Sequence, residues 1–356
     1  MQKPRPVLAS YDVHANVWRE TGGDTAYWRG ADNKWHSGTI EQARNAQKLV
    51  KPTYQAVTQA PLPSLPAASA LKPIPKTIHQ IWLGGDIPES YRNAIISNVK
   101  RTKGYQHILH VDVDDPATFK EISKSLGKHG IKVRKLQDEP FFQNFRASEH
   151  GRMYDFFRKT NPKTQNYAAA SDVLRYRLLE EYGGIYLDAD DKIMGIKVRG
   201  TLQAANGDVL LNDAVHMPVG EHTYGFNTSV IASQPRNPFF KKLLDESLIR
   251  FKQRKPGLQQ RPRDQPNQLS QAGERYASDI FYVTGPTVFN DMLERYSPNL
   301  AYMGRHPDKY FPSNGIRIYD RDYRFQYNDA RTYYLPFSGG DFQIRVGSEH
   351  SWAHSR

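Results

Sequence analysis

The sequence of 356 residues contains no cysteine, which excludes disulfide bonds and zinc sites built from thiolates. This absence suits a protein that crosses redox compartments or unfolds for export, and chance explains it equally well. No apolar run is long enough to span a bilayer as a helix. Residues 1–6 lack the apolar core of a secretory signal, so we expect any export to use another route.

What the chain does contain is typical of a globular protein with a basic surface. Hydrophobic residues make up 38% and aromatic residues 12% of the sequence, and the formal net charge is +12. A basic balance attracts polyanions. The basic residues are scattered, however, and no nucleic-acid recognition motif is present, so we predict no nucleic-acid partner. An acidic membrane face or an acidic acceptor stays open as the reason for the charge.

Two domains are predicted. Residues 1–73 form a leader in which Trp18, Trp28 and Trp35 alternate with glycine and charge, a pattern that fits a small packed hairpin unit. The end of this leader, residues 52–73, is rich in proline, alanine and serine and is therefore predicted to be a linker. The main domain is predicted to cover residues 74–356.

The main domain alternates short apolar runs with helical patterns, which predicts an α/β fold with a mostly parallel sheet covered on both faces. The predicted strands are 78–83, 107–113, 131–136, 185–187, 209–211 and 226–232. The predicted helices are 88–100, 117–126, 153–158, 168–182 and 238–251, of which 153–158 belongs to a helical insertion.

Two later stretches differ from this alternation. Residues 252–275 are rich in glutamine, arginine and proline and have few apolar side chains, so we expect a mobile loop. Residues 282–293 are predicted to contain the end of a strand, a tight turn, and a helix with Pro286 in its first turn.

The stretch 168–191 is the one on which the functional hypothesis depends. A helix ends at Gly183 and Gly184, and a three-residue strand then leads to Asp188 and Asp190. In an extended chain, residues two apart project to the same side, so both carboxylates are expected to reach one point. A divalent cation with oxygen ligands, such as Mg²⁺ or Mn²⁺, would compensate their repulsion and leave coordination positions for substrate phosphates.

An Asp-x-Asp pattern alone is weak, because the chain contains a second one at Asp112 and Asp114. There Pro116 and a helical stretch follow, so Asp114 or Asp115 is expected to cap a helix. Support for the first pattern comes from Asp172 and Arg175, which lie three apart on one helical face. They can offer a carboxylate to ribose hydroxyls and a guanidinium to phosphate, or they can simply form an ion pair within the helix.

The combined motif, Ala169-Ala170-Ser171-Asp172-x-x-Arg175 followed by 182–190, resembles the DXD-containing sugar-binding region of retaining glycosyltransferases. It is similar to the large clostridial glucosylating toxins, related glycosylating effectors and yeast-type initiating mannosyltransferases. The sequence 78–85 likewise resembles the family's first strand, and 224–232 resembles the strand beneath the donor sugar.

The resemblance implies a GT-A fold, a Rossmann-like sheet with helical insertions, that binds a UDP-sugar with Mn²⁺ or Mg²⁺. It implies that Trp82 stacks on the nucleotide base, although Trp82 on its own fits a core position as well. It makes Asp188, Asp190 and Arg175 the catalytic residues, with Asp190 as the direct metal ligand. The remaining residues of the donor site are then Ile81, Leu83, Asp172, Tyr186, Ala189 and Asn227.

The C-terminal residues add a further expectation. Members of the family carry a serine and a tryptophan near the end that close over the donor, and the resemblance assigns these roles to Ser351 and Trp352. Ser351 directly precedes Trp352 here, so either Ser351 or Glu349 is expected to complete the metal site, with His350 as another candidate. We predict that this tail orders on donor binding as a lid.

The favoured function is therefore metal-dependent, retaining transfer of glucose or N-acetylglucosamine from a UDP-sugar to a host protein such as a small GTPase. A secreted bacterial toxin or effector acting in the host cytosol fits that function. An enzyme of capsule or cell-surface glycan synthesis in the bacterial cytoplasm is the alternative. A catalytically inactive binding module is the other class of function. Membrane contact is left open.

Overall fold

The computed structural model describes residues 9–12, 17–20, 25–30, 32, 34–48, 59–158, 161, 163–195, 201–217, 223–262, 270–310, 321–339 and 342–347. The chain divides into two compact units: residues 1–60 with 306–326, and residues 61–305 with 327–356. No helix in the described part is long and apolar enough to cross a membrane.

The first unit contains a four-stranded antiparallel sheet in the order β1-β2-β3-β4, followed by one helix. The elements are β1 (Ala9–Asp12), β2 (Val17–Glu20), β3 (Ala26–Arg29), β4 (Trp35–Gly38) and α1 (Ile40–Lys48). Ala26 and Ala43 are buried where Trp28 and Ile40 pack against them. The predicted small hairpin unit is therefore a complete meander with a helix.

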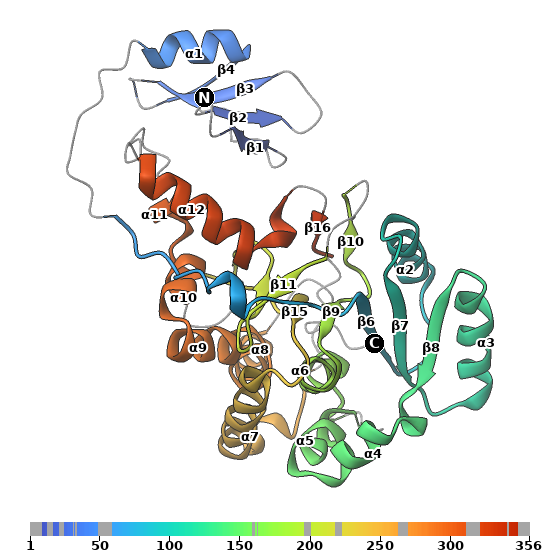
Figure 1. Cartoon of the computed structure of the whole chain (residues 1–356). Coiled ribbons are helices and arrows are strands. Elements are labelled where there is room, and N and C mark those ends of the chain that lie inside the picture. The colour runs from blue at the N-terminus through green and yellow to red at the C-terminus, as the bar shows by residue number, and fades with distance from the viewer. Residues whose placement is uncertain are drawn as a thin grey trace. The chain divides into compact units, whose positions relative to one another are not determined.

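The second unit is built on a six-stranded sheet in the order β12-β15-β9-β6-β7-β8, and only β15 runs against the other strands. Its strands are β12 (Leu210–Leu211), β15 (Val230–Ser233), β9 (Gly184–Leu187), β6 (Thr77–Leu83), β7 (Gln106–Asp112) and β8 (Ile131–Lys135). The mostly parallel α/β architecture that the sequence predicted is thereby confirmed (Figure 1).

Helices cover this sheet. They are α2 (Glu89–Arg101), α3 (Pro116–Gly127), α4 (Pro140–Ala147), α5 (Glu149–Arg158), α6 (Tyr167–Tyr182), α7 (Pro238–Leu258), α8 (Gln271–Val283), α9 (Pro286–Tyr296) and α10 (Pro298–Arg305). Residues 327–334 of α12 (Arg321–Tyr334) also belong to this unit, whereas α11 (Pro307–Tyr310) and the start of α12 belong to the first. The 3₁₀ turns are η1 (Ala68–Ala70), η2 (Leu136–Asp138) and η3 (Pro336–Ser338). Asp115 caps α3 by accepting from the backbone N–H groups of Ala117 and Thr118, as the sequence predicted.

Three two-stranded ribbons complete the unit. They are β5 (Lys72–Pro73) with β11 (Gln203–Ala204), β10 (Lys192–Ile193) with β16 (Ile344–Arg345), and β13 (Val215–His216) with β14 (Tyr224–Gly225). The first ribbon corrects the linker prediction for 52–73, because β5 pairs with β11 and Ile74 N–H donates to Leu202 O. The end of that stretch is thus part of the packed unit.

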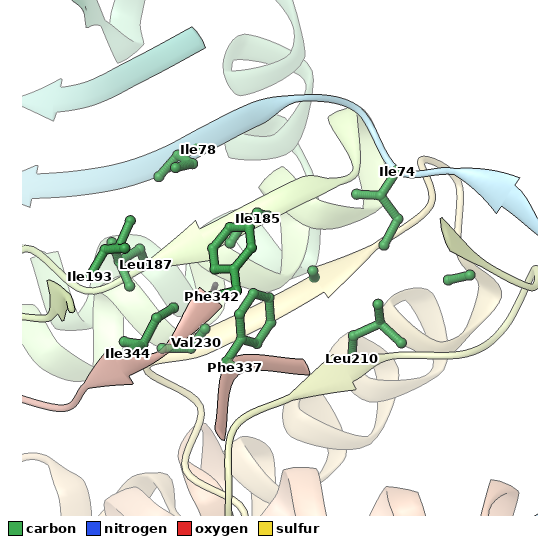
Figure 2. Packing of buried hydrophobic residues seen from close by; sticks show 12 residues of the cluster. Ile74, Ile78, Ile185, Leu187, Ile193, Leu210, Val230, Phe337, Phe342 and Ile344 are labelled. Carbon is green, nitrogen blue, oxygen red and sulfur yellow. The ribbon is translucent and has the colours of Figure 1, made fainter. Parts of the chain in front are cut away.

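One face of the sheet packs on residues that come from the C-terminal segment. Figure 2 shows Phe337, Phe342 and Ile344 lying against Val230 and Ile185 from the central strands. The C-terminal strand β16 is therefore held by the core, and it carries the chain toward the carboxyl ends of β6 and β9.

Two local predictions were wrong because distant aromatic side chains stabilise helices there. The expected loop 252–275 begins inside α7, whose Arg254 and Lys255 lie over the rings of Tyr282 and Phe156. Tyr282 and Val283, which were predicted to end a strand, are the last two residues of helix α8. Few apolar residues precede Leu258 in this stretch, and this concealed the contacts, since long cationic side chains cover aromatic surface with their stems.

Candidate active site

A cavity of 340 Å³ lies at the carboxyl ends of β6 and β9, where ligands bind in open α/β sheets. The structure brings ten of the sequence-predicted residues to its wall, namely Ile81, Trp82, Leu83, Asp172, Arg175, Tyr186, Asp188, Ala189, Asp190 and Asn227. Ser351, Trp352, Glu349 and His350 lie outside the described residues.

Arg175 is the buried cation at the centre of this site. Its Nη2 atom lies 3.1 Å from Asp172 Oδ1 and 3.2 Å from Asp188 Oδ1. Its Nη1 atom donates to Thr228 O at 2.6 Å, and the guanidinium lies 4.6 Å from the ring centroid of Tyr186. The Nε atom has no hydrogen-bond partner in the described part of the chain. The guanidinium is therefore fixed, with one buried donor that has no partner among the described residues.

Asp172 forms the ion pair within α6 that the sequence allowed, and the contacts continue beyond the helix. The hydroxyl of Thr284 donates to Asp172 Oδ2 at 3.1 Å, and Tyr176 OH donates to Thr284 O at 2.9 Å. Burial raises the pKa of the Asp172 carboxyl to about 7, although Arg175 acts in the opposite direction. The segment between α8 and α9 thus positions Asp172.

Asp188 is fixed by the strands on both sides of β9. Its backbone N–H donates to Ser229 O at 2.9 Å, and its carbonyl accepts from Gln80 Nε2 at 3.3 Å. The hydroxyl of Tyr186 donates to Asp188 Oδ1 at 2.6 Å. Burial raises the pKa of Asp188, Arg175 lowers it, and Asp190 raises it again. The sheet therefore delivers this carboxylate directly to Arg175.

The carboxylates of 188–191 are gathered by a turn, which corrects the prediction that an extended chain aligns Asp188 with Asp190. β9 ends at Leu187, and Asp191 N–H donates back to Asp188 O at 3.2 Å. The turn also adds Asp191, which the sequence analysis did not assign to the site. Burial raises the pKa of Asp191 well above its ordinary value, and the charge of Asp188 adds to this.

Two other segments hold this turn from outside. Asn98 on α2 donates to Asp191 O at 2.9 Å and accepts from Ile193 N–H at 2.8 Å. Gly347, which follows β16, donates its N–H to Asp191 Oδ1 at 2.7 Å. A Cβ atom on Gly347 would stand 2.1 Å from Asp190 Oδ2, so only glycine fits against this carboxylate.

Trp82 belongs both to the core and to the cavity wall. It is 6% exposed, packs edge-on against Tyr91 at 5.3 Å, and donates its Nε1–H to Gly85 O at 2.8 Å. Trp82 can therefore fill a core position and line the cavity at the same time.

Asn227 also lines the cavity, and its Oδ1 accepts from Ser229 N–H at 3.2 Å, a local contact of the kind expected near a turn.

Several cavity residues were missed by sequence reasoning. Tyr167 packs on Gly84, and Arg158 lies 5.6 Å from the centre of its ring. Arg261, inside the stretch expected to be a loop, donates to Gln165 O at 3.0 Å. Val215, His216 and Met217 come from the β13–β14 ribbon. None of these residues stands in a recognisable motif, so only the fold brings them to the cavity.

The donor set fits a divalent cation. Among the described residues no group of three histidine or carboxylate side chains is arranged to hold a metal ion alone. The turn nevertheless concentrates three side chains with oxygen ligands, Asp188, Asp190 and Asp191. Burial raises the pKa of Asp188 and of Asp191, and a bound cation would offset this cost of burying the carboxylates. A hard cation that shares its coordination sphere with a ligand matches this chemistry.

Residues 88–197, which include α6 and the carboxylate turn, match the family described as the glycosyltransferase sugar-binding region containing a DXD motif. Over this segment the chain is similar to the DXD glycosyltransferases. Its DXD motif is Asp188-Ala189-Asp190, and Asp172 and Arg175 precede it in the same matched segment. The resemblance predicted from the sequence is thus confirmed.

Relatives of the chain include bacterial toxins and yeast enzymes. A toxin of Photorhabdus asymbiotica is 25% identical over 240 residues, which are 64% of this chain and 7% of the toxin. The subversion of eukaryotic traffic protein A of Legionella pneumophila is 30% identical over 131 residues, 36% of this chain and 18% of that protein. Inositol phosphoceramide mannosyltransferase 2 of Schizosaccharomyces pombe is 25% identical over 279 residues, 77% of this chain and 60% of the enzyme.

These lengths mean that the chain spans only a small part of the bacterial relatives and less than two thirds of the yeast enzyme. Among solved structures, the PaToxG glycosyltransferase is similar with a TM-score of 0.55 and 21% identity, over 76% of this chain and 89% of that structure. This likeness confirms the predicted GT-A fold.

Proposed function

We propose that the chain transfers a hexose from a UDP-sugar to a protein acceptor, with retention of the anomeric configuration. The observation that carries the proposal is the placement of Arg175. Its guanidinium is held by Asp172, Asp188 and Thr228, yet its Nε–H has no described partner and the residue lines a cavity that is open to a ligand. A fixed cation in the wall of such a cavity is suited to a diphosphate.

The donor would lie across the cavity from Trp82 to the carboxylate turn. Trp82, with Tyr91 behind it, forms an aromatic wall on which a base could stack. Asp172 lies at the other side of Arg175, within reach of sugar or ribose hydroxyls. Asn227 and the residues of the β13–β14 ribbon stand where the hexose and its acceptor would meet.

The carboxylates Asp190 and Asp188 would hold Mn²⁺ or Mg²⁺, which when bound supplies positive charge to the departing diphosphate. Arg175 stabilises the same developing charge from the protein side. Tyr186, whose pKa is raised well above its ordinary value by burial, stays protonated and keeps donating to Asp188. The acceptor then attacks on the face from which the diphosphate leaves, so no enzymic nucleophile is required in line.

We propose a protein acceptor because the relatives include bacterial toxins. The same relatives support a role as a toxin or effector that acts in a host cytosol. The names of the yeast relatives point to a different acceptor class, an inositol phosphoceramide lipid. A cell-surface glycan acceptor would place the enzyme in the bacterial cytoplasm instead.

The test has two steps. The purified chain is first incubated with UDP-glucose or UDP-N-acetylglucosamine and Mn²⁺, and released UDP is measured with and without a chelator. Metal-dependent release is expected, whereas an inactive binding module would release none. Intact-mass analysis of host lysate proteins then identifies the acceptor. A hexose or N-acetylhexosamine mass added to a protein supports the proposal, and incorporation only into lipid or polysaccharide contradicts the protein acceptor.

A further inference from the structure

Six exposed lysines gather at the edge of the sheet opposite the cavity. The parallel strands β6, β7 and β8 all begin at this edge, and α2 and α3 both end there (Figure 1). Lys76 directly precedes β6, and Lys100 and Lys124 lie in the last turns of α2 and α3. Lys103 and Lys128 follow these two helices, and Lys132 is the second residue of β8. We call this set the basal lysine surface.

The charge of this surface is not neutralised locally. Residues 99–111 and 122–135, which contain Lys100, Lys103, Lys124, Lys128 and Lys132, have no aspartate or glutamate.

 Asp112 directly follows the first of these segments and is buried, and Glu121 directly precedes the second. In the described part of the chain, no carboxylate lies within 4.0 Å of any of the six lysine amines. The basal lysine surface therefore presents unpaired positive charge to solvent.

The shape of this surface is open. Gly104, Gly127 and Gly130 stand at its turns, and a Cβ atom built on any of them would meet nothing within 4 Å. The lysines do not line the donor cavity. A surface of this kind cannot enclose a small anion, but it can approach an extended, flat one.

The basal lysine surface presents amines with few aromatic side chains among them, and this composition favours a diffuse electrostatic contact. Arg101 is the one arginine of the two helix ends, and it donates to Met194 O at 3.2 Å. Tyr105 is turned inward, where it packs against Phe342 at 5.8 Å. Protein interfaces depend on buried aromatic and arginine anchors, and single-stranded nucleic acid needs exposed aromatic rings for stacking. Neither feature is present among the described residues of this surface.

Met194 adds an apolar contact to the charge. It is 40% exposed and follows β10, beside the end of α2 where Arg101 bonds to its carbonyl. An exposed thioether next to a group of lysines suits the boundary between lipid headgroups and acyl chains.

We propose that the basal lysine surface docks the chain on a membrane rich in anionic lipid. The attraction of a negatively charged leaflet for lysines near it acts without specific pairing and is screened by salt. β6 has seven residues, so the cavity stands about 20 Å from this edge of the sheet. Docking in this way leaves the donor cavity open and facing away from the lipid.

The test is co-sedimentation of the full chain with phosphatidylcholine vesicles. One set contains phosphatidylcholine alone, and in the other about one lipid in three is phosphatidylserine. The variant K100Q/K103Q/K124Q/K128Q removes four charges from the basal lysine surface. The variant K241Q/K242Q/K252Q/K255Q removes four exposed charges from α7 and is the matched control. Melting temperature and UDP release are measured for each to show that the fold and the cavity are intact.

We expect the chain to bind only the anionic vesicles and to lose binding as salt rises. The basal variant should lose about a hundredfold or more in vesicle affinity, whereas the α7 control should bind nearly as the unmodified chain does. Equal losses in the two variants would show that net charge alone is responsible and would overturn the proposal. Binding to RNA or to an acidic polypeptide, without any binding to anionic vesicles, would overturn it as well.

Discussion

Arg175 makes two ion pairs and a bond to a backbone carbonyl, so its position depends on three separate segments of the chain. Each partner restricts the guanidinium in a different direction, and the ring of Tyr186 supports it from one face. Such a cation does not need to reorganise when negative charge develops near it. At the scale of single residues, the site is therefore rigid before any ligand arrives.

The two carboxylates of the DXD motif are expected to differ when each is replaced by asparagine. Asp190→Asn should reduce UDP release by orders of magnitude while the melting temperature stays nearly unchanged. Asp188→Asn should reduce activity similarly and also cost about 1–3 kcal/mol of stability, because it weakens the bonds to Arg175 and Tyr186. Asp138→Asn, an exposed substitution on η2, is the control. Near-normal turnover in both DXD variants would contradict the assignment.

Trp82 is expected to affect stability and nucleotide binding together. The side chain is 6% exposed, so its removal leaves a cavity in the core even if the indole also stacks on a base. Trp82→Ala should therefore lose about 3–5 kcal/mol and weaken UDP binding. Leu109→Ala, in the same buried cluster but away from the cavity, should lose stability only. Thermal melts with and without UDP separate the two effects, and equal UDP affinity in both variants would remove Trp82 from the donor site.

At the scale of elements, the carboxylate turn depends on the segment that follows β16. Gly347→Ala should displace the carboxylate of Asp190, because the new Cβ would lie 2.1 Å from Oδ2 and 2.3 Å from Cγ. We expect a large loss of activity, about tenfold or more, with a small change in melting temperature. Gly339→Ala, in the same C-terminal segment with nothing within 4 Å of its Cβ, should behave like the unmodified chain. Full activity in Gly347→Ala would show that this contact does not position Asp190.

The elements that could be predicted from the sequence are those with a local signal. The strands at 78–83 and 107–113 and the helix at 168–182 were predicted from apolar periodicity and glycine stops, and the structure confirms them within one or two residues. The extension of α7 to Leu258 could not be predicted, because it depends on rings from α5 and α8.

The candidate site divides in the same way. Asp172, Arg175 and Asp188 lie within one short stretch, so the sequence could place them together before the fold was known. Thr284 and Gly347 come from segments about a hundred residues or more away, and no pattern links them to Arg175. The turn at 188–191 was also missed, since Asp-x-Asp reads equally well as an extended chain.

At the scale of the whole molecule, the two compact units differ in what holds them together. In the first unit the described cluster is Ala26 and Ala43 with Trp28 and Ile40 packed against them, whereas the second unit contains the six-stranded sheet and the cavity. The boundary predicted between residues 73 and 74 stays a prediction. The cavity and its described wall lie within the second unit, so we expect that unit to carry the donor site.

Buried histidines give the whole molecule a predictable dependence on pH. His107 is 2% exposed with Thr102 Oγ1 at 2.6 Å from its Nε2, and burial lowers its pKa from 6.5 to about 4. Burial also lowers the pKa of His79 well below its ordinary value. Above pH 6.5 these rings are neutral in both states. As the pH falls from 6.5 toward 4, the unfolded chain binds protons that the folded chain does not, so stability must fall.

For His107 alone, this loss should approach about 3 kcal/mol by pH 4. Thermal melts between pH 7.5 and about 4 measure it, and the fall in melting temperature should be shallower in His107→Asn than in the unmodified chain. His129→Asn, a partly exposed histidine on the turn before β8, should leave the slope unchanged. If His107→Asn and the unmodified chain lose stability in parallel over this range, His107 takes up its proton in the folded protein as readily as in the unfolded one, and the acid sensitivity must come from other groups such as His79.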